Sequence, residues 1–124
     1  GDFLGGCICT GVRLSQEAVV KGTSKLPHFE MVIPDKIIAR TTITNLQSGL
    51  LYGYVGQVNY IVAQMREEMG EPYAKVVATG GFAHLIAQRS EVIDHIDGLL
   101  TLKGIRMVYE KNRDPHAQET TRAV

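Results

Sequence analysis

Two short stretches of the chain combine residue types that suit the binding of a small polar ligand. The first reads V-V-A-T-G-G-F-A and places Thr79, Gly80 and Gly81 between an apolar run and a helical pattern. Because glycine has no Cβ, this pair lets a ligand come close to the main chain, and the following helix start adds amide donors and a positive dipole end. The stretch suits a nucleotide, but a plain strand-to-helix turn is the simpler explanation of these residues alone. It matches neither a Walker loop nor the G-x-G-x-x-G fingerprint.

The second stretch is A-R-T-T-I-T-N-L-Q-S-G at positions 39–49. An arginine, several hydroxyls and amide side chains gather where a helix begins. Together they can hold a polar ligand through O–H donors and exposed helix amides. Capping explains the same residues, with Thr41 or Thr42 supplying the N-cap oxygen, and both interpretations stay open on this pattern alone.

The other reactive residue types form no catalytic or metal-binding pattern. Asp94 and Asp97 flank Ile96 and are expected in a solvated turn. The histidines are scattered, and none has a cysteine or an acid at a ligand spacing, so we expect no metal site in this chain. No Ser-His-Asp or Cys-His set follows from residue order, and no catalytic residue is assigned to this chain. The four histidines are His28, His84, His95 and His116.

The opening residues F-L-G-G-C-I-C-T, positions 3–10, read as a strand. Cys7 and Cys9 would share one face of that strand and are poor disulfide partners at this spacing. We expect them to act as small buried hydrophobes, as free cysteines usually do. A single strand needs a neighbour, which must come from later in this chain or from another polypeptide.

A long helix is predicted over 42–69, because apolar residues recur there at spacings of three and four. Gly49, Gly53 and Gly56 fall on one of its faces, although each costs about 1 kcal/mol relative to alanine in a helix interior. Such a face makes sense where another backbone approaches closely. Two arrangements remain open: a helix crossing inside this fold, or a symmetric contact between subunits.

Shorter apolar runs alternate with polar connections over the rest of the chain, which predicts an α/β fold. We expect residues 1–112 to form one domain and 113–124 to form a polar, flexible tail. The expected elements are a helix over 12–20, a short strand or packed loop over 29–33, a short strand over 37–39, a buried strand over 75–78, a helix over 82–89, an apolar run over 92–96 and a helix over 99–110.

Composition narrows the class of protein. The 124 residues are 44% hydrophobic, enough for one folded domain, and thirteen basic residues balance thirteen acidic ones. A net charge of zero argues against a domain that binds nucleic acid by neutralising phosphates. No run is long and apolar enough for a membrane span, no secretory signal is seen, and unpaired cysteines favour the reducing cytoplasm.

The ordered set of motifs resembles the C-terminal half of type III pantothenate kinases over residues 2 to about 112. The motifs are F-L-G-G-C-I-C-T-G-V-R-L-S, K-L-P, A-R-T-T-I-T-N-L-Q-S-G-L-L-Y-G-Y-V-G, V-A-T-G-G-F-A and L-L-T-L-K-G-I-R-M-V-Y-E-K-N. The resemblance implies a ribonuclease-H-like half of an actin-like ATPase fold, with a mixed sheet, flanking helices and one long interface helix. It also implies a cytoplasmic dimer that uses ATP, Mg²⁺ or a similar divalent ion, and a monovalent cation such as K⁺ or NH₄⁺.

The resemblance assigns roles to four residues. Thr42 corresponds to the family's pantothenate-contacting threonine, and Thr79, Gly80 and Gly81 correspond to its adenosine turn. The long glycine-bearing helix resembles the one that forms the family's dimer, beside which the pantothenate pocket lies. Four positions depart from the family pattern: Thr41 replaces asparagine, Asn45-Leu46 replaces Ala-Met, and Thr10 replaces proline.

The family's first phosphate loop, its G-x-D-R catalytic aspartate and its D-x-G-T second phosphate loop have no counterpart in these 124 residues. Phosphoryl transfer depends on positioned phosphates and a base. The expected function is therefore a subunit or fragment of an ATP-dependent pantothenate kinase, active only when a second polypeptide, or a removed N-terminal half, completes it. The alternative is a non-catalytic regulatory or assembly subunit of the same fold.

Overall fold

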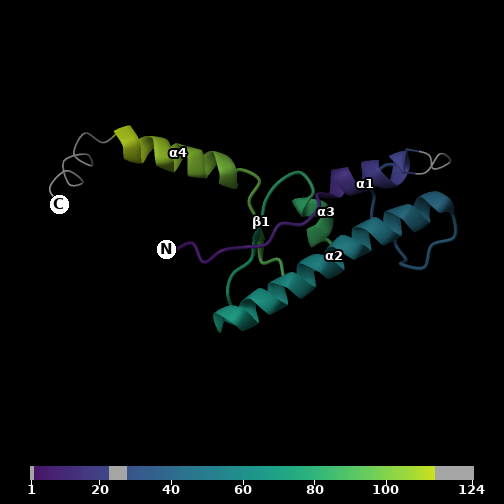
Figure 1. Ribbon diagram of the computed structural model, residues 1–124, viewed down its shortest axis with the longest axis horizontal. Helices are drawn as coiled ribbons and strands as arrows, with labels where there is room; N and C mark the ends of the chain where they lie inside the picture. The colour runs from purple at the N-terminus through teal and green to yellow at the C-terminus, as the bar shows by residue number, and fades with distance from the viewer. Residues whose placement is uncertain (1, 23–27, 114–124) are drawn as a thin grey trace.

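The computed structural model describes residues 2–22 and 28–113. Its elements, in chain order, are α1 (Val12–Lys21), α2 (Thr42–Met69), β1 (Val77–Ala78), α3 (Ala83–Ala87), β2 (His95–Ile96) and α4 (Leu100–Arg113). Figure 1 shows the long α2 passing beneath the other elements, with α4 pointing away from them. The predicted tail lies outside the described residues, except for Arg113, which ends α4.

The predicted boundaries of α2 are confirmed, and its ends show why. The Thr41 hydroxyl accepts a hydrogen bond from the Thr44 amide at 3.2 Å, and the Thr44 hydroxyl accepts one from the Thr41 amide at 3.1 Å, which completes a capping box. At the other end, Gly70 adopts φ +66, a left-handed conformation that glycine takes without steric cost. The capping interpretation of Thr41 is therefore correct.

The sheet is smaller than predicted. In the described part of the chain it consists of β1 and β2, which run parallel with Val77 opposite His95 and Ala78 opposite Ile96. The strand predicted over 75–78 shortens to two residues, and Val77 is exposed rather than buried. The protein is thus a mixed α/β chain with a small parallel sheet, and a ribonuclease-H-like or actin-like arrangement remains a prediction.

The hydrophobic core is built on one face of α2. Leu51 is completely buried and packs with Val55 and with Ile86 of α3. Partly buried side chains surround this cluster: Met31, Ile33, Tyr54, Val58, Leu85 and Ile93. Tyr54 also links α2 to the start of the chain, because its hydroxyl lies 2.6 Å from Ser15 Oγ and donates to the Thr10 carbonyl at 2.7 Å.

The short strands considered over 29–33 and 37–39 do not form. The connection from α1 to α2 is irregular here. Its carbonyls accept hydrogen bonds from side chains of α2 and not from the backbone of a neighbouring strand. Ser48 donates to the Ile37 carbonyl at 2.6 Å, and Tyr52 donates to the Pro34 carbonyl at 2.9 Å. Phe29 is buried, which supports the packed-loop alternative for the first stretch.

Much apolar surface stays exposed. Phe3 is 91% exposed, Ile8 is fully exposed, and every residue of α4 is exposed. The exposed apolar side chains of α4 include Leu102, Ile105 and Val108. Among the described helices, none has both the length and the apolar character that a membrane crossing needs.

Candidate functional site

The turn at Thr79, Gly80 and Gly81 lies between a strand and a helix, as the sequence predicts. β1 ends at Ala78, and Thr79, Gly80 and Gly81 lead into α3, with the Ala83 amide donating to the Gly80 carbonyl at 3.1 Å. Gly80 has φ +93, where a side chain would be strained. A Cβ placed on Gly80 or Gly81 would meet nothing within 4 Å, so the main chain is open to a ligand. Because α3 has only five residues, its helix dipole adds little.

Thr42 is the first residue of α2 and is exposed. Its neighbour Thr41 forms the helix cap with Thr44, so the cap does not use the Thr42 hydroxyl. A shallow pocket beside the cap is lined by Pro34, Asp35, Lys36, Ile38, Ala39, Arg40 and Thr44. Arg40, a cation suited to a carboxylate or phosphate, lines this pocket and precedes Thr42 by two residues.

The glycine face of α2 is open. A Cβ on Gly49, Gly53 or Gly56 would meet no atom within 4 Å, and all three residues are exposed. The alternative of a helix crossing inside this fold is therefore wrong for the described residues. Thr42 lies seven residues before Gly49, two turns along the same face. A partner on the glycines would consequently approach Thr42 as well.

The structure does not bring the two predicted stretches together in one pocket. A further pocket on the glycine face is lined by Ile37, Asn45, Ser48, Gly49, Tyr52 and Gly53, and it includes neither Thr42 nor the Thr79–Gly81 turn. The turn joins β1 to α3 (Figure 1), whereas Thr42 begins α2. Each stretch forms an exposed surface, and neither forms a closed pocket by itself.

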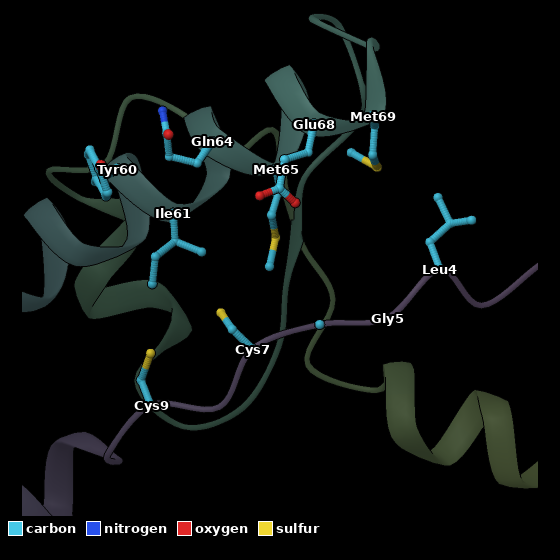
Figure 2. A pocket seen from close by; sticks show the side chains of 11 residues that line it. Leu4, Gly5, Cys7, Cys9, Tyr60, Ile61, Gln64, Met65, Glu68 and Met69 are labelled. Carbon is cyan, nitrogen blue, oxygen red and sulfur yellow. The ribbon is translucent and has the colours of Figure 1, made fainter.

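Cys7 and Cys9 are exposed thiols, which contradicts the expectation that they are buried. They lie on the side of the opening segment that faces the end of α2, across a groove that also contains Ile61 and Met65 (Figure 2). The opening segment that lines one side of this groove is exposed and forms no strand in the described chain. The remaining lining residues are Leu4, Gly5, Gly6, Tyr60, Gln64, Glu68 and Met69.

Asp94 has a structural role that its sequence context did not reveal. Its carboxylate accepts hydrogen bonds from Lys75 Nζ at 2.8 Å and the Val76 amide at 2.9 Å, and it lies 3.4 Å from Arg66 Nη2 of α2. The hydrogen bond from Lys75, followed by that from Val76, lowers the pKa of Asp94 below its usual value. Asp94 therefore joins α2 to both strands, and the expected solvated turn is more constrained than predicted.

Asp97 holds the start of α4 in a similar way. It accepts hydrogen bonds from Lys103 Nζ at 2.7 Å and from the Leu99 amide at 3.0 Å, and the bond from Lys103 is the main cause of its lowered pKa. Acidic residues that precede an apolar run are a sequence signal for such helix-start contacts. Within the described ranges, no group of three or more His, Cys, Asp or Glu side chains could hold a metal ion.

Part of this chain matches a protein-family model. The model of type III pantothenate kinase matches residues 1–64, just over half of the 124 residues. The matched part contains the opening segment, Thr42 and the glycine face of α2, whereas Thr79, Gly80 and Gly81 lie outside it. The chain therefore belongs to the type III pantothenate kinase family.

Proposed function

We propose that this chain supplies the adenosine- and pantothenate-binding walls of an ATP-dependent pantothenate kinase. In that reaction the pantothenate hydroxyl oxygen bonds to the γ-phosphorus of ATP. The bond from the γ-phosphorus to the β–γ bridging oxygen breaks, and 4'-phosphopantothenate and ADP are formed, the first step of coenzyme A biosynthesis. The observation that carries this proposal is the family match over residues 1–64.

In this proposal, one stretch of the chain binds pantothenate and the other binds adenosine. The Thr42 hydroxyl forms a hydrogen bond with pantothenate at the start of α2, and Arg40, two residues earlier, supplies a cation for its carboxylate. The open main chain at Gly80 and Gly81 supports an adenosine lying against it, since no atom lies within 4 Å of either would-be Cβ. Thr79 provides a hydroxyl beside the same turn.

In this proposal the catalytic aspartate and both phosphate loops lie outside residues 1–124, which contain neither G-x-D-R nor D-x-G-T. They belong to the N-terminal half of the kinase, on the same polypeptide or on a second one, and that half would also hold the proton acceptor and the phosphates. The divalent ion, Mg²⁺ or a similar one, would accompany those phosphates, as no cluster for it exists among the described residues. A monovalent cation, K⁺ or NH₄⁺, completes the expected requirements.

The assembly we propose is cytoplasmic and dimeric through α2, within a ribonuclease-H-like half of an actin-like ATPase fold. The open glycine face supports the dimer, since two backbones can approach closely where three side chains are only hydrogen atoms. The unpaired apolar surface of the opening segment and of α4 supports completion by another chain.

Reconstitution tests the proposal. A separately produced N-terminal half of a type III pantothenate kinase, carrying the catalytic aspartate and both phosphate loops, is mixed with this chain. We expect turnover that requires ATP, pantothenate and both polypeptides. The same half with its catalytic aspartate replaced by asparagine serves as the control. A complex that forms but has no turnover above this control would refute the kinase function.

A second candidate is a non-catalytic regulatory or assembly subunit of the same fold. It is favoured by the departures at Thr41, Asn45 and Leu46, and by the use of the Thr41 hydroxyl in the helix cap. Thermal unfolding of the reconstituted complex separates the two. A ligand that binds the folded state raises the melting temperature, and the shift grows as the ligand concentration exceeds Kd. A higher melting temperature with pantothenate and with ATP supports the kinase. No shift with either ligand supports the second candidate.

A further inference from the structure

The carboxyl ends of the two strands lie at one edge of the sheet. Because β1 and β2 run parallel, the residues that follow them, Thr79 after β1 and Asp97 after β2, lie at the same edge. In open α/β sheets, ligands bind outside the carboxyl ends of the strands. Asp97 is therefore a neighbour in space of the turn that we propose for adenosine, although the two are far apart in the sequence.

A backbone hydrogen bond joins Asp97 to the start of this turn. The Asp97 amide donates to the Ala78 carbonyl at 2.9 Å. That carbonyl shares a trans peptide plane with the Thr79 amide, and in such a plane the two groups point in opposite directions. The bond from Asp97 therefore turns the Thr79 amide away from β2 and sets the direction in which the turn begins.

The Asp97 side chain fixes the same residue to the start of α4. Its carboxylate accepts hydrogen bonds from the Leu99 amide at 3.0 Å and from Lys103 Nζ at 2.7 Å, and it is only 16% exposed. An aspartate that bonds the amide two residues on closes a turn of its own backbone. The Leu99 contact can therefore orient the Asp97 main chain, whereas the half-exposed Lys103 forms an ion pair of a kind that contributes little.

Asp94 provides a comparison at the opposite end of the same strands. It precedes β2, and its carboxylate accepts hydrogen bonds from the Val76 amide at 2.9 Å and from Lys75 Nζ at 2.8 Å. Each aspartate thus bonds one backbone amide and one lysine, but Asp94 acts where the strands begin and Asp97 acts where they end. If both residues only stabilised the sheet, the loss of either carboxylate would affect a ligand at the turn equally.

We propose that Asp97 is a positioning residue for the nucleotide. Its bond to the Leu99 amide orients the Asp97 amide, which holds the Ala78 carbonyl. This contact keeps the turn at residues 79–81 in the open conformation that adenosine would contact. The identity of the ligand rests on the proposed function. The inference goes further, because it assigns the shape of the nucleotide surface to a residue that does not itself touch the nucleotide.

Four variants of this chain, each in the reconstituted complex, test the proposal. Asp97→Ala removes the acceptor of the Leu99 bond, and Leu99→Pro removes its donor at a helix start, where proline is tolerated. Asp97→Asn keeps an oxygen that can accept from the Leu99 amide, and Asp94→Ala is the matched control. Calorimetry measures the affinities for ATP and for pantothenate, and circular dichroism checks the fold of each variant.

We expect ATP affinity to fall at least tenfold with Asp97→Ala and with Leu99→Pro, while pantothenate affinity changes less than threefold. Asp97→Asn and Asp94→Ala should each change ATP affinity less than threefold, although Asp94→Ala should lower the melting temperature. In turnover, Asp97→Ala should raise the KM for ATP and retain kcat. Without nucleotide, hydrogen exchange of the Ala83 amide, which donates to the Gly80 carbonyl of the turn, should be faster with Asp97→Ala than with Asp94→Ala.

Three results would overturn the proposal. The first is an unchanged ATP affinity with Asp97→Ala, or with Leu99→Pro if Asp97→Ala does not fold. The second is an equal loss of ATP affinity with Asp94→Ala or with Asp97→Asn, since the role would then be stability of the sheet or charge. The third is an equal loss of pantothenate affinity, which would indicate a general change of the fold.

Binding and turnover are measured separately, so the two proposals can fail independently. An ATP affinity that depends on Asp97 in a complex without turnover supports the positioning role and refutes the kinase function. Turnover with the same KM for ATP in Asp97→Ala and in the wild type supports the kinase and refutes the positioning role. A wild-type complex that binds no ATP refutes both.

Discussion

The Thr42 hydroxyl is the group that most directly tests substrate binding. It is exposed at the first position of α2, and the helix cap depends on Thr41 and Thr44 rather than on Thr42. We expect Thr42→Val to raise the KM for pantothenate in the reconstituted enzyme about tenfold, as expected for the loss of one hydrogen bond of about 1.4 kcal/mol. Thr42→Ser, which keeps the hydroxyl, should have the KM of the wild type. The melting temperature of both variants should change by only about 1–2 °C, because substitutions at exposed sites usually change the free energy of unfolding by roughly 0.5 kcal/mol or less. An unchanged KM removes Thr42 from the site.

Gly81 tests the nucleotide wall. Its would-be Cβ points into open space, and no positive φ forbids a side chain there. Gly81→Leu should therefore fold normally yet fill the volume proposed for adenosine. We expect ATP affinity of the complex, measured by calorimetry, to fall by at least tenfold while pantothenate affinity is retained. Gly98→Leu, at another open glycine, is the control, and undiminished ATP affinity would make the turn purely structural.

Asp94 gives the chain a defined response to acid. Its pKa is lowered in the folded state by Lys75 and Val76, so the unfolded carboxyl takes up a proton at a higher pH than the folded one. The contribution of Asp94 is complete above its unfolded pKa, about 4, and is lost as the pH falls through the folded pKa. Asp94→Asn should flatten the decline of the melting temperature between about pH 5 and pH 2, followed by circular dichroism. An unaltered profile would show that Asp97 and other carboxyls account for it.

The open glycine face of α2 allows the stability of the helix and the formation of the dimer to be tested separately. A leucine at Gly53 meets no atom within 4 Å of its Cβ and removes a residue that costs about 1 kcal/mol in a helix. Gly53→Leu should therefore keep or raise the melting temperature of the isolated chain. If the face forms the dimer, the same change should weaken self-association of the complex at least tenfold in sedimentation equilibrium. Ala18→Leu, on the exposed surface of α1, should leave it unchanged.

The helices were predictable because their signals are local. The boundaries of α2 follow from apolar periodicity, the threonines at its start and Gly70 at its end, all of which lie in one stretch of sequence. The strands were less predictable because pairing depends on distant residues. Residues 75–78 carry a strand-like pattern, but only Val77 and Ala78 find a partner in β2.

The candidate site was predictable to a different degree at each residue. The open turn at Thr79–Gly81 forms at the predicted strand–helix junction, and the Thr41 cap was one of two stated alternatives. The contacts of Asp94 with Arg66 and Lys75 were missed, because they join positions 28 and 19 residues apart. The exposure of Cys7 and Cys9 was missed for the same reason, since burial depends on what lies across the groove.

The distribution of apolar surface links stability to assembly across the whole chain. In the described residues the buried hydrophobic side chains are few: Phe29, Leu51, Val55, Ala83 and Ile86. Large apolar side chains at both ends of the chain, such as Phe3 and Val108, remain in solvent. A domain of this size folds because of the surface that it buries. Much of the stability of this protein should therefore come from the complex rather than from the chain alone.

Leu51 tests that dependence directly, because it is the one completely buried large side chain in the described core. Leu51→Ala should cost about 2–5 kcal/mol, a large part of a marginal stability, and should unfold the isolated chain at room temperature. A partner that binds only the folded state adds about 2.7 kcal/mol at one hundred times its Kd. The melting temperature of Leu51→Ala should thus recover as the N-terminal half is titrated, whereas Leu14→Ala, at an exposed leucine, should melt like the wild type throughout. If the melting temperature of Leu51→Ala does not change when the N-terminal half is added, binding of that half does not stabilise the folded chain, and the expectation is wrong.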